Sequence, residues 1–365
     1  MSFAKEPTCD HARRPITGVL IVNLGTPQAP TASALRRYLG QFLSDPRVVE
    51  IPRLIWKPIL HGIILRVRPA KSALKYASIW MPEGSPLRVW TERQGTLLQG
   101  YMGERGHRVI VKWAMRYGEP SIASQLTAFQ AEGATRVLVV PLYPQYSGAT
   151  SASVMDDVFA WGRKARRIPE LRFVSHFHDD PRYIEALADS VRQYWLREGR
   201  GDKLLMSFHG MPERTLHLGD PYHCECHKTA RLLAERLGLS KDQYVVSFQS
   251  RFGRARWLQP YTEPTLHELG KAGVKRVDVI CPAFVSDCIE TLEEIAMEGK
   301  QAFLSSGGQD FHYIACLNDR PAWMSALAAL CEQHLQGWPT QAAEQPGEGE
   351  LQATLQRARS LGATR

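Results

Sequence analysis

The chain has 365 residues, of which 44% are hydrophobic and 22% charged, as in a soluble globular protein with room for about two domains. Its 45 Lys and Arg against 37 Asp and Glu give a formal charge of +8, but no long basic run accompanies it, so no nucleic-acid partner is expected. Seven mostly scattered cysteines and an amino terminus without the apolar core of a signal peptide argue against a disulfide framework and predict a cytoplasmic protein.

Eight apolar runs predict buried strands, and most are separated by stretches of helical period that end in Gly. The runs begin at Gly18, Arg108, Arg136, Leu171, Lys203, Tyr244, Arg276 and Phe311. Continuous apolar strands that alternate with helices are typical of parallel sheets covered on both faces. After the first strand, residues 54–67 read LIWKPILHGIILRV, which is too short and too interrupted to span a bilayer. Its mixture of apolar and basic residues predicts peripheral membrane contact.

An internal repeat divides the chain. VIVKWAMRYG from Val109 matches YVVSFQSRFG from Tyr244, and GATRVLVVP from Gly133 matches GVKRVDVIC from Gly273. Two matches in the same order predict a duplication. We expect two similar α/β domains with doubly wound sheets, at residues 15–175 and 176–335, and then a flexible tail at 336–365 with a short final helix. Ligands of such sheets bind outside the carboxyl ends of the strands, which predicts a cleft between the domains.

Ionisable residues stand at two of these predicted strand ends. His209 closes KLLMSFHG, where an imidazole can accept a proton or bind a metal; the alternative is a hydrogen-bonded turn residue. After VDVICP, the acids Asp287, Glu290, Glu294 and Glu298 are spaced to form one stripe on a helix. A stripe of like charges is commonly a solvated face, but beside a cleft it would pass a cation or carry off protons.

Arginines near the predicted cleft indicate an acidic ligand. Arg116 and Tyr117 end a repeated strand, and Arg68 follows the apolar segment; guanidinium groups suit carboxylates. The run HCECH at residues 223–227 looks like a metal motif, but its C-x-C spacing is not that of common zinc sites, and an iron–sulfur cluster is not expected there. The sequence has no G-x-G-x-x-G and no P-loop, which argues against a nucleotide enzyme.

The motifs of the chain together resemble those of ferrochelatases. VNLGTP, LYPQYSGATSAS, SFHGMPERTLHLGDPY, SFQSRFG with WLQPYTEPTL, and PAFVSDCIETLEE follow that family's order between residues 18 and 335. The resemblance implies a lyase that inserts Fe²⁺ into protoporphyrin IX to form haem. It implies two Rossmann-like domains with the porphyrin between them and a lip at residues 54–80. It also implies a bacterial cytoplasmic enzyme that needs no cofactor and takes Fe²⁺ as a substrate, and it leaves monomer or homodimer open.

The same motifs assign the candidate site residues. The family's histidine corresponds to His209 and its glutamate to Glu290, both expected in catalysis and metal binding, and Asp287 and Glu294 are expected as further metal ligands. Cys288 stands where many members have His, and the [2Fe–2S] cysteines of animal members are absent. The expected substrate contacts are Leu24, Arg68, Arg116, Tyr117, Tyr143, Ser147 and Trp257.

Two other functions stay open from the sequence. A chelatase that acts on coproporphyrin or another tetrapyrrole would share the mechanism and differ in the side chains it recognises. A non-catalytic carrier of haem or porphyrin would bind tightly without turnover, although the file of acids argues against it.

Overall fold

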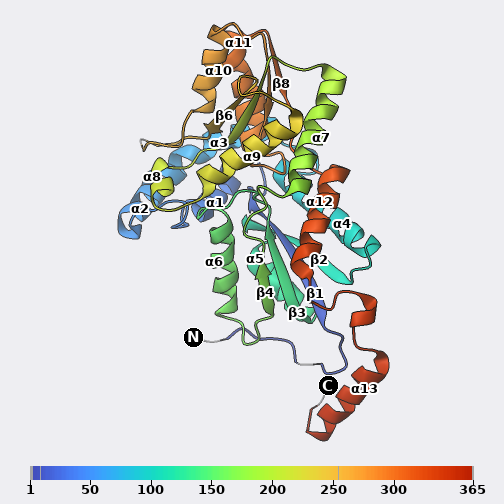
Figure 1. Cartoon of the computed structure of the whole chain (residues 1–365). Coiled ribbons are helices and arrows are strands. Elements are labelled where there is room, and N and C mark those ends of the chain that lie inside the picture. Colours follow the sequence, from blue (N-terminus) through green and yellow to red (C-terminus); the bar gives the residue numbers. More distant parts are fainter. Residues whose placement is uncertain (1–2, 9, 254, 364–365) are drawn as a thin grey trace.

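The computed structural model describes residues 3–8, 10–253 and 255–363, and each half of the chain contains one four-stranded parallel sheet (Figure 1). The strand orders are β2-β1-β3-β4 and β6-β5-β7-β8. All eight strands expected from apolar runs are present. Equal strand orders place the repeated segments, β2 with β6 and β3 with β7, at equivalent positions, which confirms the predicted α/β fold. The strands are β1 (Ile16–Gly25), β2 (Val109–Tyr117), β3 (Ala134–Pro141), β4 (Glu170–Phe173), β5 (Lys203–His209), β6 (Tyr244–Gln249), β7 (Arg276–Ile280) and β8 (Asp310–Tyr313).

Helices connect the strands and cover the sheets. Two of them are π-helices, η1 and η2, and η3 is a 3₁₀-helix. The helices are α1 (Ala32–Phe42), α2 (Arg53–Ile59), η1 (Leu60–Ile64), α3 (Leu65–Ile79), α4 (Pro86–Glu104), α5 (Ile122–Ala131), α6 (Ser151–Gly162), α7 (Pro181–Glu198), α8 (Glu213–His217), α9 (Tyr222–Leu237), α10 (Thr262–Lys271), η2 (Glu290–Gly299), α11 (Lys300–Ser305), α12 (Pro321–Leu335), η3 (Ala342–Glu344) and α13 (Glu348–Ser360).

The central strand of each sheet is buried because it is apolar on both faces. In β1, Leu20 has no exposed surface and lies opposite Val139 of β3. In β5, Leu205 is equally buried and lies opposite Val279 of β7. All pairings are parallel, so the carboxyl ends of the four strands of a sheet meet at one edge.

The two halves share one hydrophobic core. Helix α12, late in the chain, packs against α4 and β3 of the first half, whereas α7 packs against α9 of the second half (Figure 1). Trp323 of α12 belongs to the same buried cluster as Leu138 of β3 and Met206 of β5. The domain ranges 15–175 and 176–335 stay a prediction, because the packing crosses the boundary between them.

The segment predicted as a flexible tail begins with an anchored stretch. Trp338 is buried and its Nε1 donates to Glu170 Oε1 at 2.7 Å, and the amide of Arg108 donates to Thr340 O at 2.7 Å. The predicted final helix is α13, whose residues are all described and none of them buried. Within the described part of the chain, no helix has both the length and the apolar character that crossing a membrane requires.

Candidate active site

A cavity lies where the carboxyl ends of the two sheets face each other. It encloses about 980 Å³ of space free of protein atoms, part of it open to solvent. Both halves contribute to its wall, with Leu24 from β1, Tyr143 after β3 and His209 at the end of β5. Aromatic and aliphatic side chains such as Phe252 and Phe284 make up most of that wall, as expected for a pocket that takes a flat apolar ligand.

His209 presents to this cavity an imidazole whose Nε2 forms no hydrogen bond with the described residues. Its Nδ1 lies 2.6 Å from the carbonyl oxygen of Gly210. Because a carbonyl oxygen only accepts hydrogen bonds, Nδ1 carries the proton, and in the neutral ring Nε2 keeps its lone pair. That lone pair can take a proton or bind a metal ion.

The acidic segment after β7 is a π-helix, not the α-helix that its spacing suggested. All ten residues of η2, Glu290–Gly299, have this conformation, in which each amide bonds to the carbonyl five residues earlier. Its turns are wider than those of an α-helix, so residues four apart, such as Glu290, Glu294 and Glu298, lie nearly in line along one face. Rare π-helices occur often at functional sites.

Asp287 precedes η2 in the chain and does not lie on the helix face that carries the predicted stripe of acids. Its Oδ1 accepts hydrogen bonds from the hydroxyls of Tyr313 and Thr291, and its Oδ2 accepts one from Asn318 Nδ2 at 2.7 Å. The residue is buried and does not line the cavity. Because protein donors occupy both oxygens, the structure argues against the expected role of Asp287 as a metal ligand. Instead, Asp287 holds the loop from which η2 starts.

Glu290 and Glu294 connect the cavity to the outer side of η2. Glu290 lines the cavity, while Glu294 accepts hydrogen bonds from the Ser250 amide at 2.6 Å and from the Ser250 hydroxyl. Burial raises the pKa of Glu294, and the Ser250 hydrogen bonds and the neighbouring His209 only partly offset that effect. Glu294 also borders a hollow on the molecular surface together with Glu298. A file of carboxyl groups therefore leads from solvent to the cavity.

Lys75 of α3 pairs with the outer acids of this file. Its Nζ lies 2.8 Å from Glu298 Oε1 and 2.9 Å from Glu293 Oε1. Burial raises the pKa of Glu293, although its hydrogen bond with Lys75 opposes the shift. The outer end of the file is thus partly neutralised, and the uncompensated charge lies further in.

Arg116 and Tyr117, both expected to bind substrate, belong to a closed polar cluster. The Asp45 Oδ2 atom accepts hydrogen bonds from Arg116 Nη2 at 2.6 Å, Tyr117 OH at 2.8 Å and Ser153 Oγ at 2.6 Å. Neither Arg116 nor Tyr117 lines the cavity. Asp45 neutralises the guanidinium, so the structure gives this pair a role in the fold and no free cation for a ligand carboxylate.

Arg68 is better placed to meet a ligand. It is exposed on α3, its guanidinium lies 5.9 Å from the ring centre of the cavity residue Phe252, and no carboxylate in the described part of the chain forms an ion pair with it. Ser147, by contrast, is buried and donates to Asp220 Oδ2 at 3.1 Å, so it fixes its loop. Three further predicted contacts do line the cavity: Leu24, Tyr143 and Trp257.

Sequence reasoning missed several cavity residues. Met211 directly follows the motif histidine and glycine, a position that could have drawn attention to it. Phe42 of α1 gave no signal, because an apolar residue on an amphipathic helix is normally core. Cys288 also lines the cavity, and burial together with the nearby Glu290 raises the pKa of its thiol, so the group stays protonated.

The family model for ferrochelatase matches residues 16–335. The chain belongs to the ferrochelatase family. The ferrochelatase of Methylibium petroleiphilum is 63% identical over 363 residues, which cover 100% of this chain and 99% of the relative. The ferrochelatase of Polaromonas sp. is 64% identical over 370 residues, with 100% of both chains covered.

The ferrochelatase fold is shared with a more distant solved structure. SirB from Bacillus subtilis with Fe³⁺ superimposes with a TM-score of 0.52 at 13% identity, over 88% of this chain and 96% of that one. At this identity the likeness concerns the fold alone. It agrees with the two similar α/β halves, and the family match confirms the resemblance to ferrochelatase seen in the motifs.

Proposed function

We propose that this protein inserts Fe²⁺ into protoporphyrin IX and releases protohaem. The observation that carries the proposal is the free Nε2 of His209 in an apolar cavity that Glu290 also lines. Metallation removes two pyrrole protons and delivers one divalent cation. A base on one wall of a flat apolar pocket and a file of carboxyl groups leading to solvent supply what those two steps need.

In this proposal His209 and the glutamates divide the proton transfers. His209 Nε2 accepts a pyrrole proton, because its other nitrogen is committed to Gly210 O. Glu290 takes the second proton and supplies hard anionic oxygens for the incoming cation. Glu294, whose pKa burial raises, can hold and release a proton closer to neutral pH than an ordinary glutamate, and it passes protons to the outer hollow.

The charge of the cavity supports protoporphyrin as the substrate. None of the described residues that line it is Lys or Arg. A porphyrin with two propionates can bury its apolar edge here and leave the propionates at the mouth, where Arg68 is free to bind one of them. Coproporphyrin, which has four such groups, would place more carboxylates against an apolar wall, and that costs free energy.

The test is anaerobic metallation followed by the visible spectrum. Purified protein receives Fe²⁺ with protoporphyrin IX or, in parallel, coproporphyrin III. We expect rapid metallation of protoporphyrin, lost in His209→Ala and in His209→Asn, both of which lack the Nε2 base. Porphyrin binding and far-ultraviolet circular dichroism serve as controls for folding. Wild-type turnover in both folded variants would contradict the proposal, and metallation of coproporphyrin alone would change the substrate.

We also propose that the protein is cytoplasmic and touches a membrane surface through α2, η1 and α3. Leu54 is 91% exposed and Leu74 is 75% exposed, and the basic residues Lys57 and Lys71 lie exposed on the same segment. Such a mixture favours insertion of apolar side chains beside anionic headgroups. Co-sedimentation with anionic liposomes at low salt should decrease in Leu54→Ser/Leu74→Ser. No binding of the unmodified protein would contradict this proposal.

A further inference from the structure

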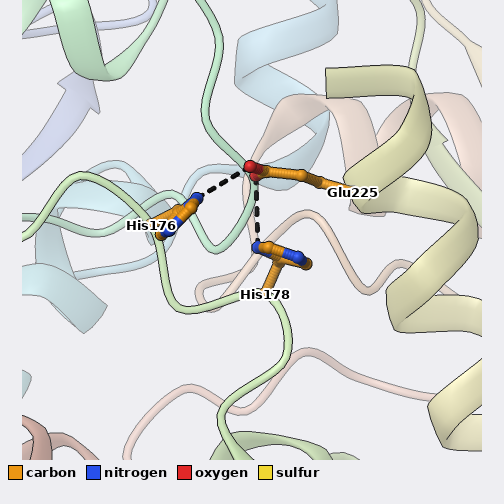
Figure 2. A group of neighbouring side chains, drawn as sticks. All are labelled: His176, His178 and Glu225. Carbon is orange, nitrogen blue, oxygen red and sulfur yellow. Dashed lines mark hydrogen bonds and ion pairs between the residues drawn. The ribbon is translucent and has the colours of Figure 1, made fainter. Parts of the chain in front are cut away.

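Three side chains outside the porphyrin cavity converge on one point. His176 and His178 lie in the loop between β4 and α7, and Glu225 projects from α9 (Figure 2). His176 Nδ1 is 2.7 Å from Glu225 Oε1, and His178 Nδ1 is 3.2 Å from Glu225 Oε2. One nitrogen or oxygen atom from each residue lies within 4.8 Å of the others, which is close enough to share an ion.

His178 Nδ1 is a buried polar atom without a hydrogen bond. The residue is only 5% exposed, and among the described residues no group forms a hydrogen bond with this nitrogen, although Glu225 Oε2 lies beside it. Leaving such an atom without a partner costs free energy.

We propose that His176, His178 and Glu225 bind a divalent transition-metal ion at a site separate from the porphyrin cavity. Two imidazole nitrogens and one carboxylate form a ligand set suited to Zn²⁺ or Fe²⁺, whereas Mg²⁺ and Ca²⁺ prefer oxygen ligands. His176 is exposed, so the ion has a route from solvent and water can complete its coordination. A metal at His176 Nδ1 requires the neutral tautomer of that ring with its proton on Nε2, so the proton moves from one ring nitrogen to the other through solvent.

This site uses one residue of the HCECH run and leaves out its cysteines. Cys224 is exposed and Cys226 is fully buried, so the two thiols do not point to a common ion. The rings of His223 and His227 lie 4.5 Å apart and pack against Phe248. Of the run, Glu225 lies beside His176 and His178 from the loop after β4.

The site lies behind the loop that forms one wall of the cavity. Glu225 Oε2 also accepts a hydrogen bond from the amide of Tyr146 at 2.7 Å. The preceding residue, Gln145, lines the cavity and donates to Thr229 Oγ1 of α9 at 3.0 Å. A metal at Glu225 therefore ties the loop 143–150 and the loop that follows β4 to α9, and it stiffens the wall without contacting the porphyrin.

Zn²⁺ titration by calorimetry tests the site in full-length protein stripped with a chelator. The background is His209→Ala/Glu290→Gln, which removes the metal-binding groups of the cavity. We expect one Zn²⁺ per chain in this background and a fall in affinity of at least about 100-fold when His176→Ala is added, since the change removes a direct ligand. His176 is exposed, so its substitution should leave the fold intact.

His227→Ala is the matched control, because it removes another exposed histidine near Glu225. In the same background it should retain the Zn²⁺ affinity, and Co²⁺ should give visible d–d absorption bands that His176→Ala alone abolishes. Zn²⁺ should also raise the melting temperature except in His176→Ala. Absence of Zn²⁺ binding in the background would overturn the proposal. So would binding that survives His176→Ala and is lost in His227→Ala.

Discussion

Asp45 in the first half and Glu294 in the second are carboxyl groups withdrawn from solvent near the ends of equivalent edge strands, β2 and β6. At Asp45, burial alone would raise the pKa, but hydrogen bonds from Ser153, the Arg47 amide and Tyr117, together with the Arg116 charge, outweigh it and hold the pKa below its usual value. At Glu294 burial prevails and the pKa is raised, because donors come from one residue, Ser250.

The difference separates a carboxylate that stabilises the fold from one that is available for chemistry. Both halves have the same sheet edge, and at that of the second half Glu294 keeps a pKa raised by burial. Ionisable groups whose pKa is shifted by burial are typical of functional sites. Four substitutions test whether the two carboxyl groups differ in this way.

Replacing the compensated carboxylate should have the largest effect, on stability. Asp45→Asn leaves the Arg116 guanidinium, only 17% exposed, with the more distant Asp157 carboxylate at 3.9 Å in place of its close counter-ion, so we expect a loss of about 3 kcal/mol. Urea denaturation measures it. The control is Asp156→Asn, which breaks the exposed pair with Arg47 and should cost about 1 kcal/mol or less. Equal losses in the two variants would show that the Asp45 cluster is not special.

Replacing the innermost acid should affect turnover and leave stability nearly unchanged. Glu290→Gln keeps the shape and removes the base, so iron insertion should fall on the order of 100-fold. Porphyrin binding, followed by fluorescence, and the urea midpoint should stay close to those of the wild type. A destabilised variant with normal turnover would place Glu290 in the same class as Asp45.

The raised pKa of Glu294 predicts a specific dependence of stability on pH. A carboxyl group that binds its proton more tightly when folded favours the native state below its unfolded pKa, near 4.5, and this advantage is lost as pH rises through the folded pKa. Between pH 4 and pH 7 the wild type should therefore lose free energy of unfolding relative to Glu294→Gln. Chemical denaturation at each pH measures the difference. A constant difference would mean that Glu294 titrates normally.

The smallest effect is expected at the outer end of the file. Glu298 is 55% exposed and paired with Lys75, so Glu298→Gln should lower turnover by less than about threefold. Iron titrations at low Fe²⁺ concentration would detect it. A loss of turnover as large as that of Glu290→Gln would show that the carboxylate that matters for turnover lies at the surface and not in the cavity.

The strands and the central histidine could be predicted because their signals are local. Apolar runs identify β1 and β5 by themselves, and the position of His209 at a strand end places it at the ligand-binding edge. The family motifs then added Glu290 and the cavity residues Tyr143 and Trp257. All of these residues could be identified from short stretches of sequence, without knowledge of the contacts between distant parts of the chain.

The side chains whose surroundings the sequence did not predict belong to pairings distant in sequence and to an uncommon helix. Arg116 reads as a free cation until Asp45 is found opposite it, and Asp287 reads as a ligand until Tyr313 and Asn318 are seen to occupy its oxygens. The sequence did not predict that η2 is a π-helix, because the periodicity used to recognise helices is that of α-helical turns. Likewise, Glu225 alone gave no reason to connect it with His176.

Helix α12 has a consequence for how the chain is made. Its residues 321–335 cover β3 and α4, elements that a ribosome completes almost two hundred residues earlier. During synthesis one apolar face of the first sheet therefore stays uncovered until α12 has been made. Cooperative folding of the amino-terminal half can be completed only near the end of translation. A chain that terminates before residue 321 would expose that face permanently and become a substrate for chaperones and proteases.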